Sequence, residues 1–146
     1  GKQGRSISQD RAFEYVYGYT ILNDVTSRRL QREHQQWFLG KSLDGFCPMG
    51  PAIVTADEIS DVTQLRVQTW INGELRQDDR VASLIFDIPA LIETLSRTMT
   101  LEPGDIIATG TPAGVGMGFN PPRFLKKGDQ VKIMIEPIGV LENPVS

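Results

Sequence analysis

The chain has 146 residues with a formal net charge of −3, 40% hydrophobic residues and 23% charged residues. This length suits a single domain that buries a core without disulfides or metal ions. The mild acidity, the scattered Lys and Arg, and the lack of any apolar run near the roughly 20 residues that span a bilayer argue against nucleic acid and against a membrane as partners.

The first half of the chain predicts two helices and two strands. Ser8 is a typical N-cap residue, and the apolar positions that follow it recur at helical spacing. Residues 19–25 (YTILNDV) are apolar and β-branched, which predicts a buried strand. A polar helix is expected to start near Thr26 or Ser27, and a breaker-rich loop, FCPMGP, separates it from a short strand at AIVT.

The second half contains the clearest local signal, LRVQTWINGELRQ. Apolar and polar residues alternate there, and Asn72-Gly73 supplies the two positive-φ residues of a type I′ hairpin turn. The run IPALIETLSRTM has apolar residues at helical spacing, with Pro89 tolerated in the first turn. DIIA predicts a short buried strand, and GDQVKIMIEPIGVLENPV predicts two more strands broken near Pro137 and Gly139.

Together these elements predict a β-rich mixed α+β fold without internal repeats or an interdomain linker. The chain starts almost directly with a helix that leads into a strand. Such a start is expected of the later part of a larger domain, so residues 1–146 are interpreted as one domain that is incomplete at its N-terminal side.

Asp24 stands where the apolar strand ends and the next helix begins. A carboxylate at this place could bind Mg²⁺, which prefers carboxylate and water oxygens in octahedral geometry. It could also cap the helix or form an Asx-turn. The residues alone leave both interpretations open.

Three further side chains are candidates for a site. Arg28 and Gln31 are three residues apart and share a helix face, where they could hold a substrate carboxylate or simply face solvent. Lys41 follows the apolar residues 37–39, which could desolvate it, lower its pKa and suit it to stabilise an oxyanion or handle a proton. The alternative is a surface lysine whose stem packs on those neighbours.

The remaining candidates for a functional site are supported by weaker sequence signals. His34, the only histidine, lies in a polar run and is expected at the surface, and one histidine cannot build a histidine-rich metal site. Cys47, the only cysteine, cannot form an internal disulfide, which fits a reducing cytoplasm. It has no basic neighbour and is interpreted as buried and structural. Residues 104–116 (GDIIATGTPAGVG) lack the end of a P-loop but could be either a turn or a ligand-binding loop.

Three motifs in this order, GYTILNDVTSRRLQ, FLGKSLDGFCPMGP and LEPGDIIATGTPAGVG, resemble the fumarylacetoacetate hydrolase family. The likeness is closest to its bacterial branch of acylpyruvate hydrolases and isomerase/decarboxylases of aromatic catabolism, and it extends over about residues 1–137. Each motif alone is weak, but their order, together with NGELRQ and LIETLSRTMTLEPGD, makes the match strong.

The resemblance implies a mixed-sheet β-roll that acts as a homodimer and uses Mg²⁺ or Mn²⁺ to bind a 2-oxo acid or its enolate through two oxygens. Asp24 matches the family's metal-binding aspartate, and Lys41 matches its active-site lysine. Arg28 and Gln31 match polar positions that face the substrate. Thr111, in TGTP, matches the threonine that contacts the substrate carboxylate.

The chain departs from the family pattern in two ways. The Glu-x-Glu metal pair, and the lid histidine and glutamate of hydrolytic members, have no match in it and are expected upstream of residue 1. The resemblance therefore implies the C-terminal portion of a catalytic domain, which supplies one metal carboxylate. Residues 80–82 (RVA) stand where many relatives have Asn-Thr-Ser, which leaves the substrate preference open.

The leading hypothesis is a cytoplasmic, metal-dependent hydrolase or lyase that acts on a small 2-oxo or 2,4-dioxo acid. The metal would draw electrons from the 2-oxo group and Lys41 would stabilise the enolate during C–C hydrolysis or decarboxylation. One alternative is an isomerase/decarboxylase of 2-oxo-heptenedioate intermediates, which needs no water-activating pair. An alternative of another class is a non-catalytic module that contributes to an oligomer.

Overall fold

The chain folds into two sheets of antiparallel strand pairs with the α-helices on one side of them. The computed structural model describes the backbone of residues 1–146 and every side chain except that of His34, so the surface position expected for the His34 side chain lies outside the described residues. One sheet pairs β1 with β2, and the other has the order β4-β3-β5-β6. The strands are β1 Gly18–Leu22, β2 Met49–Thr55, β3 Arg66–Ile71, β4 Glu74–Arg80, β5 Gln130–Ile135 and β6 Gly139–Pro144.

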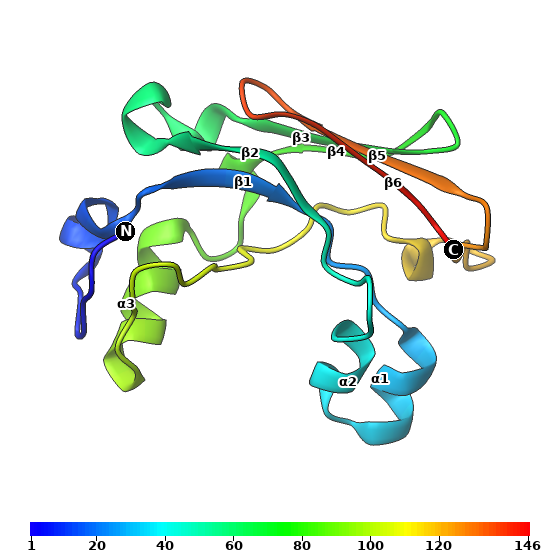
Figure 1. Ribbon diagram of the computed structural model, residues 1–146, viewed down its shortest axis with the longest axis horizontal. Coiled ribbons are helices and arrows are strands. Elements are labelled where there is room, and N and C mark those ends of the chain that lie inside the picture. The colour runs from blue at the N-terminus through cyan, green and yellow to red at the C-terminus, as the bar shows by residue number, and fades with distance from the viewer.

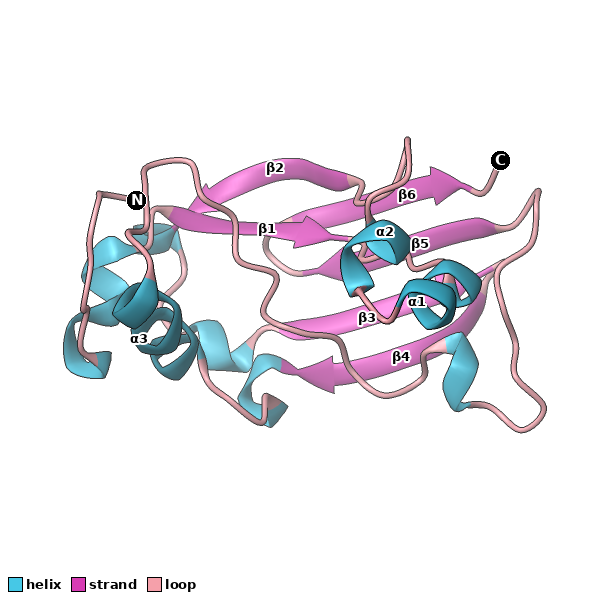
Figure 2. Ribbon diagram, turned by 90° about the horizontal axis from the view of Figure 1, so that it is seen from below, coloured by secondary structure: helices cyan, strands magenta, loops and turns pink.

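The α-helices are α1 Arg28–His34, α2 Trp37–Lys41 and α3 Ile88–Thr98. Figures 1 and 2 show α3 near the N-terminus, at one end of the sheets, and the α1–α2 pair farther along on the same side. None of the helices formed by the described residues is long and apolar enough to cross a bilayer. The predicted β-rich α+β class is confirmed.

The main core joins the two sheets. Strand β5 alternates the buried residues Val131, Ile133 and Ile135 with more exposed ones, the period of two expected of a strand with one buried face. Ile21 of β1, which is 1% exposed, packs in the same cluster. Each such side chain contributes about 1.5–3 kcal/mol of burial free energy. The strand that leads to the site, β1, is therefore fixed to the larger sheet.

A second, smaller core lies under α3. Ser96 is fully buried, and its hydroxyl accepts a hydrogen bond of 3.0 Å from the backbone N–H of Ile7. Asp87 is the N-cap of α3, and its carboxylate accepts from the Ala90 N–H at 2.8 Å, with Pro89 in the first turn. The predicted helix at IPALIETLSRTM is confirmed, and its cap explains why it begins there.

The predicted β3–β4 hairpin is also confirmed. Asn72 and Gly73 have φ values of 51° and 81°, as a type I′ turn requires. The pairing is interrupted by a bulge, because Thr69 pairs with Gln77 whereas Trp70 pairs with Leu75. One residue of β4 is therefore extra at this point.

Three segments of the first half take a form other than the predicted one. The predicted first helix is a 3-10 helix, Gln9–Tyr15, and Ser8 occupies its N-cap without a side-chain capping bond. Strand β1 ends at Leu22, so residues 23–25 leave the ladder and lead toward α1. Residues 37–41, for which no helix was predicted, form the short helix α2.

The predicted strand at DIIA is wrong. Residues 105–108 have no strand assignment, Ile106 is 58% exposed, and Ile107 packs against the α3 cluster. A short apolar run predicts that a segment is buried, but it does not specify whether another strand pairs with the backbone of that segment. The prediction that Cys47 is buried is also wrong, because the connection between α2 and β2 runs over the surface and leaves this residue exposed.

Candidate active site

The α1–α2 pair is closed by a contact at Gly40. The Ser27 N–H, at the N-cap of α1, donates to the Gly40 carbonyl oxygen at 2.7 Å. A Cβ on Gly40 would lie 3.0 Å from the backbone nitrogen and Cβ of Gln31, so the absence of a side chain lets α2 approach α1 this closely. The next residue, Lys41, is thereby placed beside the segment that leaves β1.

Lys41 is held by two polar partners. Its Nζ donates to Asp24 Oδ2 at 2.5 Å and to Thr26 Oγ1 at 3.1 Å. The Lys41 side chain is 29% exposed and that of Asp24 is 46% exposed. An ion pair this accessible adds at most about 1 kcal/mol to stability, so its main effect is to orient the ammonium group.

Two of the interpretations left open for this segment are not supported by the structure. The apolar residues 37–39 do not desolvate Lys41, because their own side chains are exposed. Asp24 is not the cap of α1, because Ser27 occupies that position. The Asp24 carboxylate instead faces Lys41, which leaves the metal-ligand interpretation as a proposal.

Arg28 and Gln31 contact each other on the first turn of α1. Arg28 Nη1 donates to Gln31 Oε1 at 2.9 Å, and both side chains are half-buried. Because the Gln31 oxygen is occupied, its amide N–H groups remain as donors beside the remaining guanidinium N–H groups. The pair therefore presents several donors, which suits a carboxylate.

Thr111 lies in the loop that carries the motif TGTP. Its Oγ1 accepts a hydrogen bond of 2.8 Å from Gln77 Nε2, and the same nitrogen donates to the Pro112 carbonyl at 2.8 Å. Thr111 itself is exposed. The loop is thus connected to β4 by one side chain.

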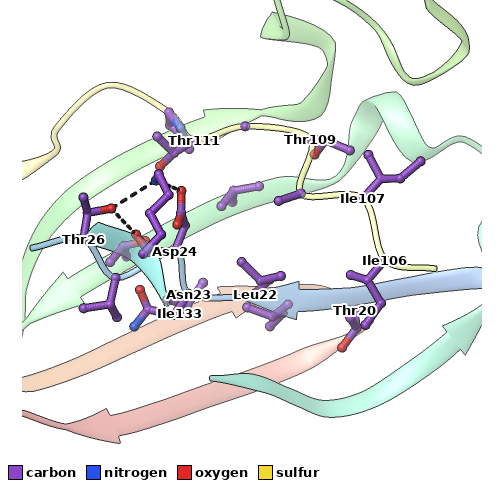
Figure 3. A pocket seen from close by; sticks show the side chains of 18 of the residues that line it. Thr20, Leu22, Asn23, Asp24, Thr26, Ile106, Ile107, Thr109, Thr111 and Ile133 are labelled. Carbon is purple, nitrogen blue, oxygen red and sulfur yellow. Dashed lines mark hydrogen bonds and ion pairs between the residues drawn. The ribbon is translucent and has the colours of Figure 1, made fainter. Parts of the chain in front are cut away.

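One cavity of about 1990 Å³ is lined by all of the predicted site residues: Asp24, Arg28, Gln31, Lys41 and Thr111. Figure 3 shows Thr111 at the same end of this cavity as Asp24 and Thr26, whereas Ile106 lies at the other end. Small-molecule pockets usually hold about 300–1,000 Å³, so this concavity is wider than one small ligand needs. A ligand that contacts the polar residues would occupy only one end of it.

The described residues do not by themselves form a metal site. No group of three His, Cys, Asp or Glu side chains lies together among them. Mg²⁺ needs about six oxygen ligands in octahedral geometry, with at least one or two carboxylates. Asp24 fits one ligand position chemically, and further ligands would have to come from outside this chain.

Comparison with known proteins decides the family. The sequence profile described as "Fumarylacetoacetate (FAA) hydrolase C-terminal" matches residues 1–146. The chain belongs to the fumarylacetoacetate hydrolase family. The resemblance stated from the motifs is thereby confirmed, including the C-terminal portion.

Relatives within the family include enzymes of more than one type. Oxaloacetate tautomerase YisK of Bacillus subtilis is 57% identical over 145 residues, which is 99% of this chain and 48% of that protein. A fumarylacetoacetate hydrolase structure from Exiguobacterium antarcticum matches with a TM-score of 0.97 and 52% identity, over 100% of this chain and 52% of that one. The chain thus spans about half the length of the relatives it matches.

A third relative is solved with a metal. Maleylpyruvate hydrolase from Sphingobium sp. SYK-6, in complex with manganese(II) and pyruvate, matches with a TM-score of 0.85 and 40% identity, over 99% of this chain and 49% of that one. At least one member of the family therefore binds a divalent metal.

Sequence reasoning missed three residues at this site. Thr26 contacts Lys41, and Gln77 holds Thr111 from 34 residues away. Asn23 also lines the cavity, and its buried Nδ2 has no hydrogen-bond partner among the described residues. Thr26 could have been found from its position two residues after Asp24, whereas Gln77 ends the motif NGELRQ, in which nothing assigned it a role.

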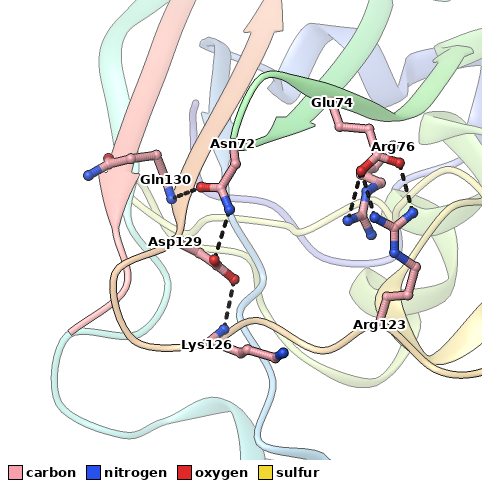
Figure 4. Close-up of polar contacts among 7 residues, drawn as sticks. All are labelled: Asn72, Glu74, Arg76, Arg123, Lys126, Asp129 and Gln130. Carbon is pink, nitrogen blue, oxygen red and sulfur yellow. Dashed lines mark hydrogen bonds and ion pairs between the residues drawn. The ribbon is translucent and has the colours of Figure 1, made fainter.

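A second group of polar contacts lies outside the polar end of the cavity, around the β3–β4 turn (Figure 4). Asn72 Nδ2 donates to Asp129 Oδ1 at 2.9 Å, and Asn72 Oδ1 accepts from the Gln130 N–H at 2.9 Å. Arg123 donates twice to Glu74, at 2.7 and 2.6 Å, which holds the pKa of that carboxyl below its ordinary value. These contacts tie the segment before β5 to the hairpin.

Proposed function

We propose that the protein that contains this chain is an enzyme that acts on a small 2-oxo acid by way of its enolate. The observation that carries this proposal is the place of Lys41, whose ammonium group is held by Asp24 and Thr26 in the cavity that Thr111 also lines. The similarity to oxaloacetate tautomerase YisK makes oxaloacetate the first substrate to test.

Lys41 stabilises the charge that develops during the reaction. An ammonium group has three N–H donors, and Asp24 and Thr26 accept from two of them. The third is left for the oxygen of the forming enolate. Because the two partners already fix the group, little reorganisation is needed when the charge appears.

The other side chains bind the carboxylates of the substrate. Arg28 and Gln31 present donors from α1, and Thr111 presents a hydroxyl from the loop. A substrate held at both ends keeps its 2-oxo group near Lys41, which favours reaction by fixing orientation.

Asp24, together with ligands from outside this chain, would hold a divalent metal, Mg²⁺ or Mn²⁺, which when bound would supply a Lewis acid for the 2-oxo group. The support for this cofactor is the carboxylate of Asp24 at the polar end of the cavity and the manganese(II) in the related maleylpyruvate hydrolase.

C–C bond hydrolysis of an acylpyruvate-type acid is the second candidate function. It is favoured by the 40% identity to maleylpyruvate hydrolase, which was solved with pyruvate. The products separate the two candidates, because tautomerisation returns the same acid in its keto form whereas hydrolysis gives two acids. Water activation would then require residues from outside this chain.

The test uses the full-length protein with oxaloacetate and with maleylpyruvate, in Mg²⁺, in Mn²⁺ and in EDTA. We expect EDTA and Asp24→Asn each to remove most of the turnover, while the exposed control Asp44→Asn retains it. Full turnover in EDTA, or in Asp24→Asn, would overturn the proposal. A non-catalytic module would show no turnover and no thermal stabilisation by either metal.

The homodimer expected from the resemblance is a further proposal. Size-exclusion chromatography with light scattering of the full-length protein tests it, and a monomeric mass would contradict it.

A further inference from the structure

The bulge in β4 brings two consecutive residues to the wall of the cavity. In a regular strand, successive side chains point to opposite faces. Here Thr69 pairs with Gln77 and Trp70 with Leu75, so Arg76 is the extra residue of the bulge. Arg76 and Gln77 accordingly both line the cavity. Bulges often re-aim a side chain in this way next to active sites.

The loop that carries Thr111 lies directly against this bulge. A Cβ on Gly114 would be 1.9 Å from the Arg76 carbonyl oxygen, so the two backbones touch there. Gln77 makes the second attachment through its two hydrogen bonds to Thr111 and Pro112. The loop is therefore docked on β4 at two neighbouring points.

The hydrogen bond to Pro112 determines how the Gln77 amide is turned. A carbonyl oxygen can only accept, so the atom of Gln77 that faces Pro112 must be the amide nitrogen. That nitrogen has two N–H groups, and the second one donates to Thr111 Oγ1. Gln77 is thus a donor to Thr111.

Because Gln77 donates to Thr111, the direction in which the Thr111 hydroxyl hydrogen can point is restricted. A hydroxyl has one donor hydrogen, and here Gln77 fills an acceptor position of its oxygen. The hydrogen is left for an acceptor from the cavity. We propose that Gln77 is a positioning residue that keeps Thr111 turned as a hydrogen-bond donor toward an anionic oxygen of the substrate. This inference rests on the proposed function only in taking that oxygen to belong to a 2-oxo acid.

The test reverses the direction of the hydrogen bond between residue 77 and Thr111 without changing the shape of the side chain at residue 77. In Gln77→Glu the introduced carboxylate can only accept, so the Thr111 hydrogen turns toward it and away from the cavity. We expect the Kd of pyruvate, the smallest 2-oxo acid, to rise about 10-fold or more by calorimetry on the full-length protein with Mn²⁺, because a bond to a charged group is lost. The control Gln130→Glu adds the same charge to an exposed position of β5 and leaves Kd within about 2-fold.

A double-mutant cycle with Thr111→Val separates positioning from a general effect on folding. Thr111→Val alone should weaken pyruvate binding, and Gln77→Glu should then add less than about 2-fold, because it acts through the missing hydroxyl. Additive losses would overturn the proposal, since a charge placed near Pro112 would weaken binding in either background. Gln77→Met, which keeps the shape and removes the donor, replaces Gln77→Glu in the same cycle if that variant does not fold.

The readouts also separate this inference from the proposed function. If Thr111→Val leaves the Kd of pyruvate and the KM of oxaloacetate unchanged, the role given to Thr111 fails and this inference fails with it. If Thr111→Val weakens binding but Gln77→Glu does not, only the role of Gln77 is wrong. In the expected case, Gln77→Glu raises KM for oxaloacetate much more than it lowers kcat.

Discussion

The α1–α2 side of the cavity and the loop of residues 104–116 both bring polar side chains to it, but different contacts fix them. Lys41 is held by partners 17 and 15 residues away, and the Arg28–Gln31 pair lies within one helical turn. Thr111 is held by a side chain 34 residues away on another strand. The first side is assembled by neighbours in the sequence, whereas the second depends on the large sheet.

Mutations on the two sides of the cavity are therefore expected to have different consequences. A change on the α1–α2 side should alter chemistry with little loss of stability, since its polar contacts are accessible to solvent. A change where the loop meets β4 should alter stability and binding together, because two backbones are in contact there.

The largest expected effect is that of Lys41→Met on kcat. This variant removes the ammonium group that Asp24 and Thr26 hold. We expect kcat for oxaloacetate to fall by about 100- to 1,000-fold, the usual cost of removing a preorganised donor from a developing oxyanion. Steady-state kinetics on the full-length protein measures it. Lys127→Met, an exposed lysine outside the cavity lining, is the control and should keep its activity.

Gly114→Ala should have the next largest effect, on stability. Its Cβ would overlap the Arg76 carbonyl, and its φ of 104° is unfavourable for alanine, so the free energy of unfolding should fall by about 2–4 kcal/mol. Gly104→Ala in the same loop has a φ of 99° with nothing within 4 Å, and should lose only about 1–2 kcal/mol. Urea unfolding compares the two, and equal losses would show that the loop is not pressed against β4.

Gly40→Ala should have a smaller effect, and it tests the contact between α1 and α2. Alanine is favoured over glycine in a helix by about 1 kcal/mol, but its Cβ would lie 3.0 Å from Gln31, so stability should change by less than about 1 kcal/mol. The small shift of α2 moves Lys41, and kcat should fall by up to about tenfold, given that a 1 Å misplacement costs on the order of 100-fold. Gly118→Ala, with its nearest atom 3.9 Å away, should leave kcat unchanged.

The smallest expected effect concerns Glu74 and pH. The hydrogen bonds from Arg123 lower the pKa of Glu74 from 4.5, so this pair stabilises the fold above that pH and ceases to do so as the pH falls through the folded-state pKa. Glu74→Gln should therefore be less stable than the wild type at pH 7, and the difference should shrink below pH 4.5. Urea unfolding across pH measures it, with Glu142→Gln, 3.8 Å from Lys132, as the control.

Elements with local signals were predicted well. The β3–β4 hairpin follows from Asn72-Gly73 between alternating strands, and α3 follows from its apolar spacing and the tolerated Pro89. Both signals lie within about a dozen residues. The wrong strand at DIIA shows the limit, because an apolar run does not specify a pairing partner.

Only part of the candidate site could be predicted from the sequence. The family resemblance named the five residues from Asp24 to Thr111, and the structure brings them to one cavity, although their roles stay predictions. Gln77 lies in the motif NGELRQ, but its role could not be predicted, because that role depends on a bulge and on a contact between distant segments. Helix α2 was missed because its five residues are placed by packing at Gly40.

The contacts of Asn72 imply an order of assembly for the large sheet. The β3–β4 hairpin can form as soon as its own residues are available, but the side chain of Asn72 finds Asp129 and Gln130 only 57 and 58 residues later in the chain. Until then the edge of β3 that will pair with β5 is unprotected and open to pairing with another molecule. During synthesis, arrival of residues 129–146 both covers this edge and fixes the turn, so truncation before this segment should promote aggregation.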